Sequence, residues 1–167
     1  MVIEAGTRID AAWGVLHTVL DPEVPALSIT DLGIVREVKL AGEGLEVVLT
    51  PTYSGCPATE VIEQSVIDAL QAAGLGPVRT KLQRAPAWTT DRMSAEGRRK
   101  LRDYGIAPPG PVDIAIGAPL HFIARNVACP RCASKQTERL SAFGSTACKS
   151  IYRCLACREP FEHFKPI

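Results

Sequence analysis

Pro51-Thr52-Tyr53-Ser54-Gly55-Cys56-Pro57-Ala58 is the stretch that decides how the first part of the chain folds. It separates a strand-like run, residues 45–50, from a run with helical periodicity, residues 58–73. Pro57 suits the first helical position, where its missing N–H would have had no partner. We therefore predict that Cys56 is the N-cap of this helix, where the helix dipole lowers a thiol pKa and favours the thiolate. The other interpretation of the same residues is a small, inert cysteine that fills a turn.

The runs on either side of this stretch predict the rest of the domain. We expect a helix at 7–20, strands at 34–40, 45–49 and 78–82, and a second helix at 58–73. Asp21-Pro22 should end the first helix, because a residue before proline avoids the helical region. Arg36 alone breaks the alternation of the first strand. The order predicts an α+β fold: a small sheet with helices packed on one face, followed by a small zinc-ribbon-like module.

The C-terminal part contains two CxxC pairs, formed by Cys129 with Cys132 and by Cys154 with Cys157. This spacing is typical of a four-thiolate zinc ribbon, although iron also binds four cysteines. A module this small buries too little apolar surface to fold securely alone, and metal binding can supply roughly 10 kcal/mol. The intervening runs, residues 137–143 and 150–153, can form a hairpin between the two pairs. Cys148 is a fifth local thiol that either packs against this hairpin or acts as an exchangeable ligand.

The predicted domains are residues 1–105, a Pro/Gly linker at 106–117, and the four-cysteine module at 118–167. The formal net charge of +1 gives no long-range attraction to nucleic acid or anionic membranes. No apolar run approaches a membrane span, and the N-terminus lacks the apolar block of a signal peptide. We expect a cytoplasmic protein, in which six cysteines indicate metal or thiol chemistry before disulfides.

Two further segments carry candidate site residues. Asp21-Pro22-Glu23-Val24-Pro25 holds two carboxylates between prolines. It is either a rigid turn with solvated acids or a pair of acidic ligands. Pro86–Asp91 follows the third predicted strand, where site residues often lie. The chain has no GxGxxG, no phosphate-binding loop and no nucleophile elbow, which argues against those enzyme classes.

Three motifs resemble the metal–sulfur cluster assembly family, which includes SufT-like proteins, over about residues 7–92. They are Asp21-Pro-Glu-Val-Pro25, Thr30-Asp-Leu-Gly-Ile-Val35 and Thr52-Tyr-Ser-Gly-Cys-Pro-Ala58. Pro86-Ala-Trp-Thr-Thr-Asp91 and the tail from Phe143 to Phe161 are similar to the PaaD branch. That branch is associated with the phenylacetyl-CoA epoxidase (ring-1,2-epoxidase) system of aerobic phenylacetate degradation.

The resemblance implies an accessory subunit that is not itself catalytic and that helps deliver iron or iron–sulfur clusters to the oxygenase and reductase components. It implies that Cys56 holds iron or a cluster transiently, with Asp21 and Glu23 as oxygen ligands. Thr52, Asp91 and Cys148 are auxiliary candidates, and a structural zinc belongs to the ribbon. The implied partners are the other epoxidase subunits, especially the iron–sulfur reductase, with a homodimer as a further expectation.

Two alternatives remain at this point. In the first, the chain is a non-catalytic assembly subunit that binds other epoxidase subunits, and Cys56 is structural. In the second, it is a cysteine hydrolase or thiol oxidoreductase. The second ranks last, because no histidine lies in the motifs and no CxxC includes Cys56.

Overall fold

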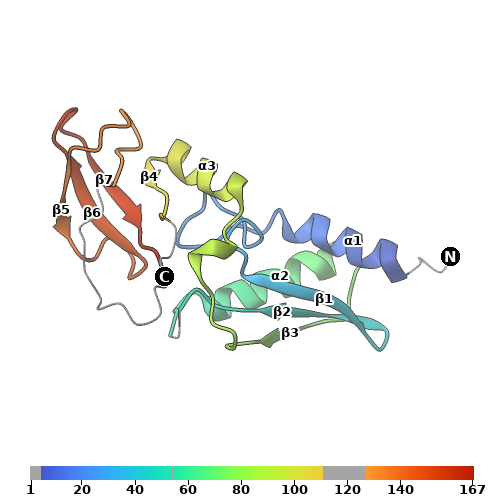
Figure 1. Ribbon diagram of the computed structural model, residues 1–167. Helices are drawn as coiled ribbons and strands as arrows, with labels where there is room; N and C mark the ends of the chain where they lie inside the picture. Colours follow the sequence, from blue (N-terminus) through green and yellow to red (C-terminus); the bar gives the residue numbers. More distant parts are fainter. Residues whose placement is uncertain (1–4, 54, 111–126) are drawn as a thin grey trace. The chain divides into compact units, whose positions relative to one another are not determined.

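The computed structural model describes residues 5–53, 55–110 and 127–167, and the chain divides into two compact units, Met1–Gly97 and Arg98–Ile167 (Figure 1). The boundary falls inside helix α3 (Ala95–Tyr104), before the predicted boundary at residue 105. The predicted linker also begins differently, because Ile106–Ala107 forms strand β4 and pairs with β7 (Pro160–Phe164). Residues 111–117 of the linker lie outside the described residues.

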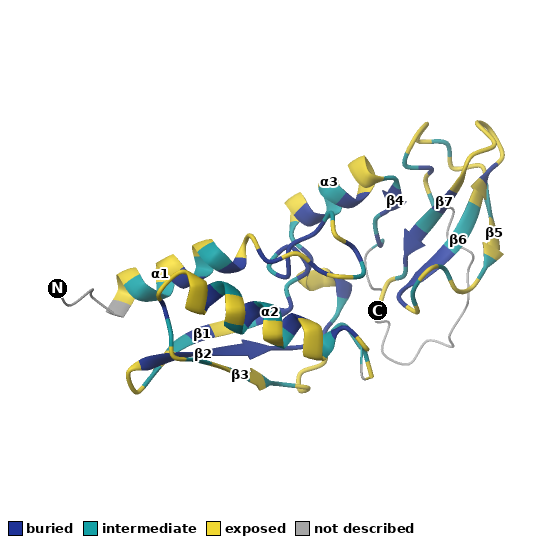
Figure 2. Cartoon of the chain, turned by 180° about the vertical axis from the view of Figure 1, so that it is seen from behind, coloured by how far each residue is buried: buried dark blue, intermediate teal, exposed yellow. Residues whose placement is uncertain are grey.

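The first unit is built on a three-stranded sheet with two helices on one face (Figures 1 and 2). The strands are β1 (Val35–Ala41), β2 (Gly44–Leu49) and β3 (Val78–Leu82), and the helices are α1 (Ala5–Leu16) and α2 (Thr59–Ala72). β1 and β2 form an antiparallel hairpin, whereas β2 and β3 are parallel. A parallel pair needs a long crossover connection, and α2 supplies it. The predicted α+β fold is confirmed.

The core of this unit lies between the helices and the sheet. β2 is buried along its whole length because it is the central strand. The predicted stripe of α2 is buried at Ile62, Val66 and Leu70, while the predicted fourth member, Ala73, is exposed. Full burial of such a side chain contributes about 1.5–3 kcal/mol, so this interface holds the helices on the sheet.

The first helix and the first strand differ from the prediction in two details. α1 ends at Leu16 rather than Leu20, because the N–H and hydroxyl of Thr18 both donate to the carbonyl of Val15 and close a turn. Leu20 is 54% exposed as a result. In β1, a β-bulge between Val35 and Glu37 explains why Arg36 breaks the alternation.

The second unit contains a four-stranded sheet in the order β4-β7-β6-β5, with β5 at Thr137–Ser141 and β6 at Lys149–Cys154. β5 and β6 form the hairpin expected between the two cysteine pairs. The buried cluster on this sheet is small and consists of Ala107, Cys129, Cys154 and Phe161. Among the described residues, no helix in either unit is long and apolar enough to cross a membrane.

Candidate metal and thiol sites

The sulfurs of Cys129, Cys132, Cys154 and Cys157 come together within 4.8 Å of one another. The Cys129–Cys157 sulfur distance is 3.8 Å and the Cys132–Cys154 distance is 3.5 Å. Tetrahedral zinc with Zn–S bonds of about 2.3 Å requires sulfurs about 3.8 Å apart. The donor set and its spacing therefore fit one tetrahedral, thiolate-preferring metal ion.

Each CxxC pair lies in a tight turn that directs its sulfurs toward this point. In the first turn, the N–H of Ala133 donates to the carbonyl of Cys129, and the N–H of Cys129 donates to Ser134. Ala133 has a positive φ of 60°, which the turn requires. In the second turn, the backbone N–H of Cys157 lies 3.5 Å from the sulfur of Cys154. Such N–H groups stabilise thiolates, as a metal site needs.

Cys154 and Cys157 differ in how readily their thiols ionise. The N–H of Cys157 is the main cause that lowers the pKa of Cys154 to about 6. The pKa of Cys157 is raised to about 12: a hydrogen bond from Glu159 favours its thiolate, but burial and the neighbouring sulfurs outweigh that bond. Metal binding at these cysteines must therefore release protons.

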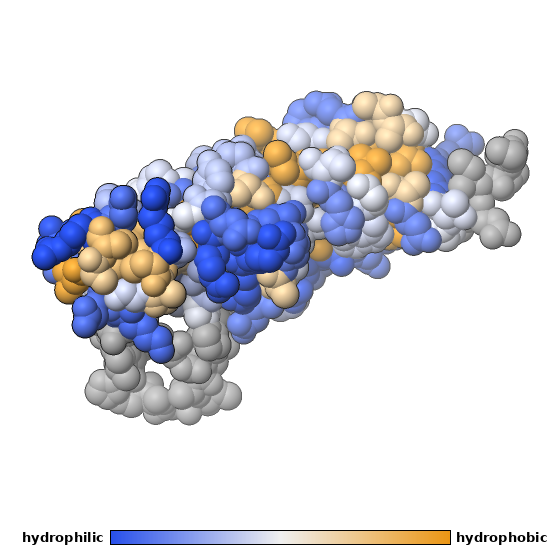
Figure 3. Space-filling view, turned by 90° about the horizontal axis from the view of Figure 1, so that it is seen from above, coloured by the Kyte–Doolittle hydropathy of each residue, from blue (hydrophilic) through white to orange (hydrophobic). Residues whose placement is uncertain are grey.

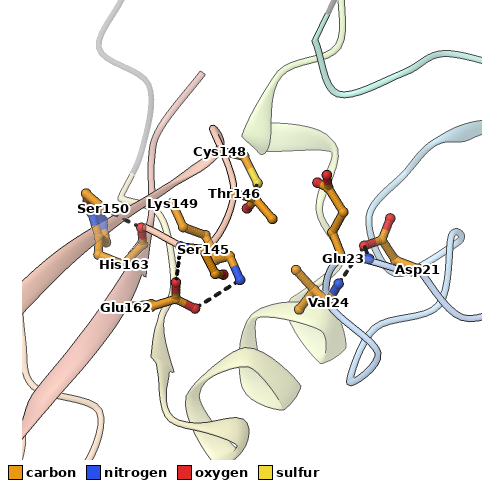
Figure 4. A network of polar contacts seen from close by, with 10 residues as sticks. All are labelled: Asp21, Glu23, Val24, Ser145, Thr146, Cys148, Lys149, Ser150, Glu162 and His163. Atoms are coloured by element: carbon orange, nitrogen blue, oxygen red, sulfur yellow. Dashed lines mark hydrogen bonds and ion pairs between the residues drawn. The ribbon is translucent and has the colours of Figure 1, made fainter. Parts of the chain in front are cut away.

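Cys148 is not part of this cluster of sulfurs. It is buried, and its sulfur lies 3.0 Å from the hydroxyl of Thr146. The loop that carries it is fixed by Glu162, which accepts a hydrogen bond from the N–H of Ser145 and forms an ion pair with the buried Lys149 (Figure 4). This placement favours the packing interpretation of Cys148.

The structure places Cys56 outside the helix that it was predicted to cap. α2 begins at Thr59 with Ala58 as its N-cap, so Pro57 belongs to the preceding turn. The carbonyl of Cys56 accepts hydrogen bonds from both the N–H and the hydroxyl of Thr59. The prediction of an N-cap thiol is therefore wrong, because the turn uses the carbonyl oxygen of Cys56 and the helix starts two residues later than predicted from Pro57.

The pKa of the Cys56 thiol is raised, which also reverses the prediction. Burial is the largest cause, and the carboxylates of Glu23 and Asp21 raise it further. Hydrogen bonds from the backbone of Ala58 and the side chain of Thr59 act in the opposite direction but do not prevail. At neutral pH Cys56 is therefore a thiol, and it must lose a proton before it can bind a metal.

The acidic segment lies close to Cys56: Asp21 lines the same pocket as Cys56, and the charge of Glu23 acts on the thiol. Asp21 is buried, and its Oδ1 accepts the N–H groups of Glu23 and Val24 at 2.9 and 2.7 Å (Figure 4). These bonds fix the turn and hold the Asp21 carboxylate in place. Glu23 is half-buried. The structure thus brings together the three residues that the sequence singled out, one sulfur and two carboxylates.

A small pocket of about 10 Å³ is lined by Cys56, and this is about the least room that admits one water molecule. Asp21, Thr52 and Thr59 provide polar groups, and its apolar wall comes from Ile34, Leu49, Pro51, Ile62 and Leu82. Asp91 is exposed in the 3₁₀ helix η1 (Thr90–Arg92) and is not among the described residues that line the pocket. The sequence reasoning missed Thr59, whose position three residues after Cys56 is the signal that would have found it.

Comparisons with known proteins match both units. Residues 9–81 match the family described as iron–sulfur cluster assembly protein, and residues 120–165 match the PaaD zinc β-ribbon domain. In solved structures, a domain of unknown function (DUF59) from Bacillus anthracis aligns with a TM-score of 0.54 and 24% identity. The alignment covers 58% of this chain and 93% of that one, and it shows the same fold for the first unit.

Two curated relatives extend this picture. A protein of Escherichia coli (strain K12), named as a putative 1,2-phenylacetyl-CoA epoxidase subunit, is 49% identical over 98% of this chain and 96% of its own length. An Fe–S protein maturation auxiliary factor of Porphyromonas gingivalis is 34% identical over 52% of this chain and 83% of its own length. These matches confirm the resemblance that the motifs carried. The chain belongs to the PaaD family of epoxidase subunits, with an iron–sulfur cluster assembly domain followed by a PaaD zinc β-ribbon domain.

Proposed function

We propose that this protein is a non-catalytic accessory subunit of a phenylacetyl-CoA epoxidase system. In this role it delivers iron or an iron–sulfur cluster to the components that carry out the oxidation. Its relatives are named as an epoxidase subunit and as an Fe–S maturation factor, which supports both halves of the proposal. The observation that carries it most is that Asp21 lines the same pocket as the half-buried Cys56, whose thiol the carboxylate of Glu23 also affects.

Such a mixed sulfur and oxygen set suits a metal that is passed on rather than kept. A closed four-thiolate site retains its ion, whereas one thiolate with carboxylates leaves positions open. The raised pKa of Cys56 adds a proton cost to binding: Fe²⁺ takes the place of the thiol proton, which passes to water. Protonation of the thiolate would in turn favour release of the ion, so binding is weak and reversible.

The four ribbon cysteines serve a different purpose in this proposal. They would hold a structural zinc ion, which their sulfur spacing and their match to a zinc β-ribbon domain support. The ion would link two turns whose shared buried cluster is small. A four-thiolate site without an open coordination position is unsuited to metal transfer.

Anaerobic equilibrium dialysis against Fe²⁺, followed by metal analysis, tests the transfer site. The wild type, Cys56→Ser and Cys148→Ser should each hold about one zinc, as one four-thiolate site allows. Extra iron should be retained by the wild type and by Cys148→Ser, which removes a buried thiol outside the cluster. Cys56→Ser should lose that iron. Equal iron in all three proteins would contradict the proposal.

An assembly role without metal transfer is the second candidate. The ribbon unit exposes several large apolar side chains, including Leu140, Phe143 and Leu155. The space-filling view shows hydrophobic patches bordered by hydrophilic residues (Figure 3). Patches of this kind often mark protein interaction sites. If this role is the whole function, Cys56→Ser should leave epoxidase assembly and activity unchanged.

A further inference from the structure

Arg92 lies directly against the turn that leads into β1. An added Cβ at Gly33 would lie 2.5 Å from the carbonyl oxygen of Arg92 and 2.8 Å from its Cβ, so only glycine permits this approach. The indole N–H of Trp88 also donates to the carbonyl of Leu32 at 2.8 Å, which ties the same segment down. The chain after β3 therefore returns to the start of β1 (Figure 1). Arg92 is held there by backbone contacts.

Arg36 lies three residues beyond Gly33, at the bulge of β1. Its Nη1 is buried and has no hydrogen-bond partner among the described residues. The pKa of Arg36 is lowered, mainly by burial and further by the positive charge of Arg92. The positive charge of Arg92 therefore acts on Arg36, and one buried N–H group of Arg36 has no acceptor among the described residues. A buried donor without an acceptor is rare in native proteins and calls for an explanation.

The carboxylates of the neighbouring strands do not supply that acceptor. Glu46 is held by Lys39 at 3.0 Å and by Arg79 at 2.8 Å. Glu37, the residue next to Arg36, forms its ion pair with Lys39 at 3.5 Å. Within the described part of the chain, neither Arg36 nor Arg92 forms an ion pair. The positive charge of this pair is thus not neutralised by the sheet.

We propose that Arg36 and Arg92 form a binding site for an oxyanion, either a carboxylate or a phosphate group. Each guanidinium presents a planar fork of N–H groups that matches the two oxygens of such a ligand. A bound oxyanion would give Nη1 of Arg36 its acceptor and would offset the repulsion between the two cations. This site is separate from the pocket at Cys56 and does not depend on the proposed transfer function.

The site is at the same end of the sheet as that pocket. Val35, next to Arg36, pairs with Leu49 of β2, and Leu49 lines the Cys56 pocket. A carboxylate from an acidic partner bound by the arginines would therefore lie at the end of the sheet where the thiol is found. A free phosphate ion has the same chemistry, so the experiment must separate these two sources.

Side-chain NMR of the arginine Nε–H groups, at constant ionic strength adjusted with chloride, tests the site with two probes. Inorganic phosphate and malonate represent the phosphate and the carboxylate source. We expect the signals of Arg36 and Arg92 to shift together and to reach saturation. Shifts with malonate would show that the site takes carboxylates, whereas shifts with phosphate alone would show that it is specific for phosphate. Shifts that do not saturate with either probe would overturn the proposal.

Variants show whether the pair itself binds the anion. Arg36→Lys keeps the charge but loses the planar fork, so binding should weaken by at least about tenfold while the circular dichroism spectrum stays unchanged. Arg92→Gln should have an effect of similar size. Arg84→Gln removes an exposed cation beyond β3 and is the charge-matched control, which should bind as the wild type does. Equal weakening by Arg84→Gln and Arg92→Gln would mean general charge attraction and would refute the site.

Discussion

Removal of the metal from the four-cysteine site should unfold the second unit and leave the first unit folded. The second unit's buried cluster has four members, and two of them, Cys129 and Cys154, are themselves metal ligands. The largest remaining member is Phe161, and Phe164 on the same strand is buried as well; the burial of each is worth about 1.5–3 kcal/mol. A structural zinc ion contributes roughly 10–16 kcal/mol of apparent binding free energy at neutral pH. The binding free energy of the metal therefore exceeds the stabilisation that burial of these side chains provides.

The first unit has its own apolar core and does not contain the cluster of sulfurs, so removal of the metal should not unfold it. Leu16, Leu27, Val66 and Leu70 are all fully buried there. A single buried leucine is worth about as much as the burial of Phe161. Several such residues share one interface between helices and sheet, which is why we expect this unit to keep its structure without metal.

The two tryptophans make the assay selective, because Trp13 and Trp88 both belong to the first unit. Trp88 is only 3% exposed, so its emission reports on that core. On titration with a strong chelator, tryptophan emission should stay constant while amide NMR signals from residues 127–167 collapse to unfolded positions. Added zinc should restore them, and Cys148→Ser should behave as the wild type does. Dispersed ribbon signals in the metal-free protein, or a red shift of Trp88 emission in step with chelation, would refute the reasoning.

Three further predictions concern single residues. Because the carboxylate of Glu23 raises the pKa of Cys56, Glu23→Gln should shift the pH profile of Cys56 alkylation to lower pH; an unchanged profile would show that the charge is too distant. Gly33→Ala should lower the free energy of unfolding by about 1–3 kcal/mol in urea, because φ is +69° and the added Cβ meets Arg92. Burial lowers the pKa of His163 from 6.5 to about 4, so the unfolded chain binds the proton first as the pH falls. His163 should therefore lower the stability of the second unit by up to about 3 kcal/mol between pH 6.5 and 4, in addition to the effect of protonating the metal-binding thiols. His163→Gln should lack this contribution when unfolding is followed by near-UV circular dichroism.

Periodicity predicted the elements that are regular along their length. α2, β2 and β3 appear where the apolar spacing placed them, and the CxxC spacing predicted the sulfur cluster that the structure assembles. Periodicity was less informative where a side-chain hydrogen bond or an extra residue interrupts a helix or strand. Thr18 closes α1 four residues early, and the extra residue at Arg36 interrupts β1. The strand β4 was not predicted, because two residues are too few to show a periodic pattern.

The error at Cys56 has a specific physical cause. Proline is compatible both with the first turn of a helix and with a turn before it, so Pro57 alone does not fix where α2 begins. The hydrogen bonds of Thr59 to Cys56 decide the matter, and they place the thiol outside the helix. The closeness of Glu23 and Asp21 to Cys56 depends on packing between distant segments, so spacing could not predict it, and the resemblance to known proteins did.

The cluster content of a partner tests the central claim most directly. The iron–sulfur reductase of the epoxidase system would be co-expressed with the wild-type chain or with Cys56→Ser, purified anaerobically, and analysed for iron and acid-labile sulfide. The account predicts a reductase poor in both when Cys56 is replaced, while the variant chain still folds and keeps its ribbon metal. A fully loaded reductase in the presence of Cys56→Ser would contradict it.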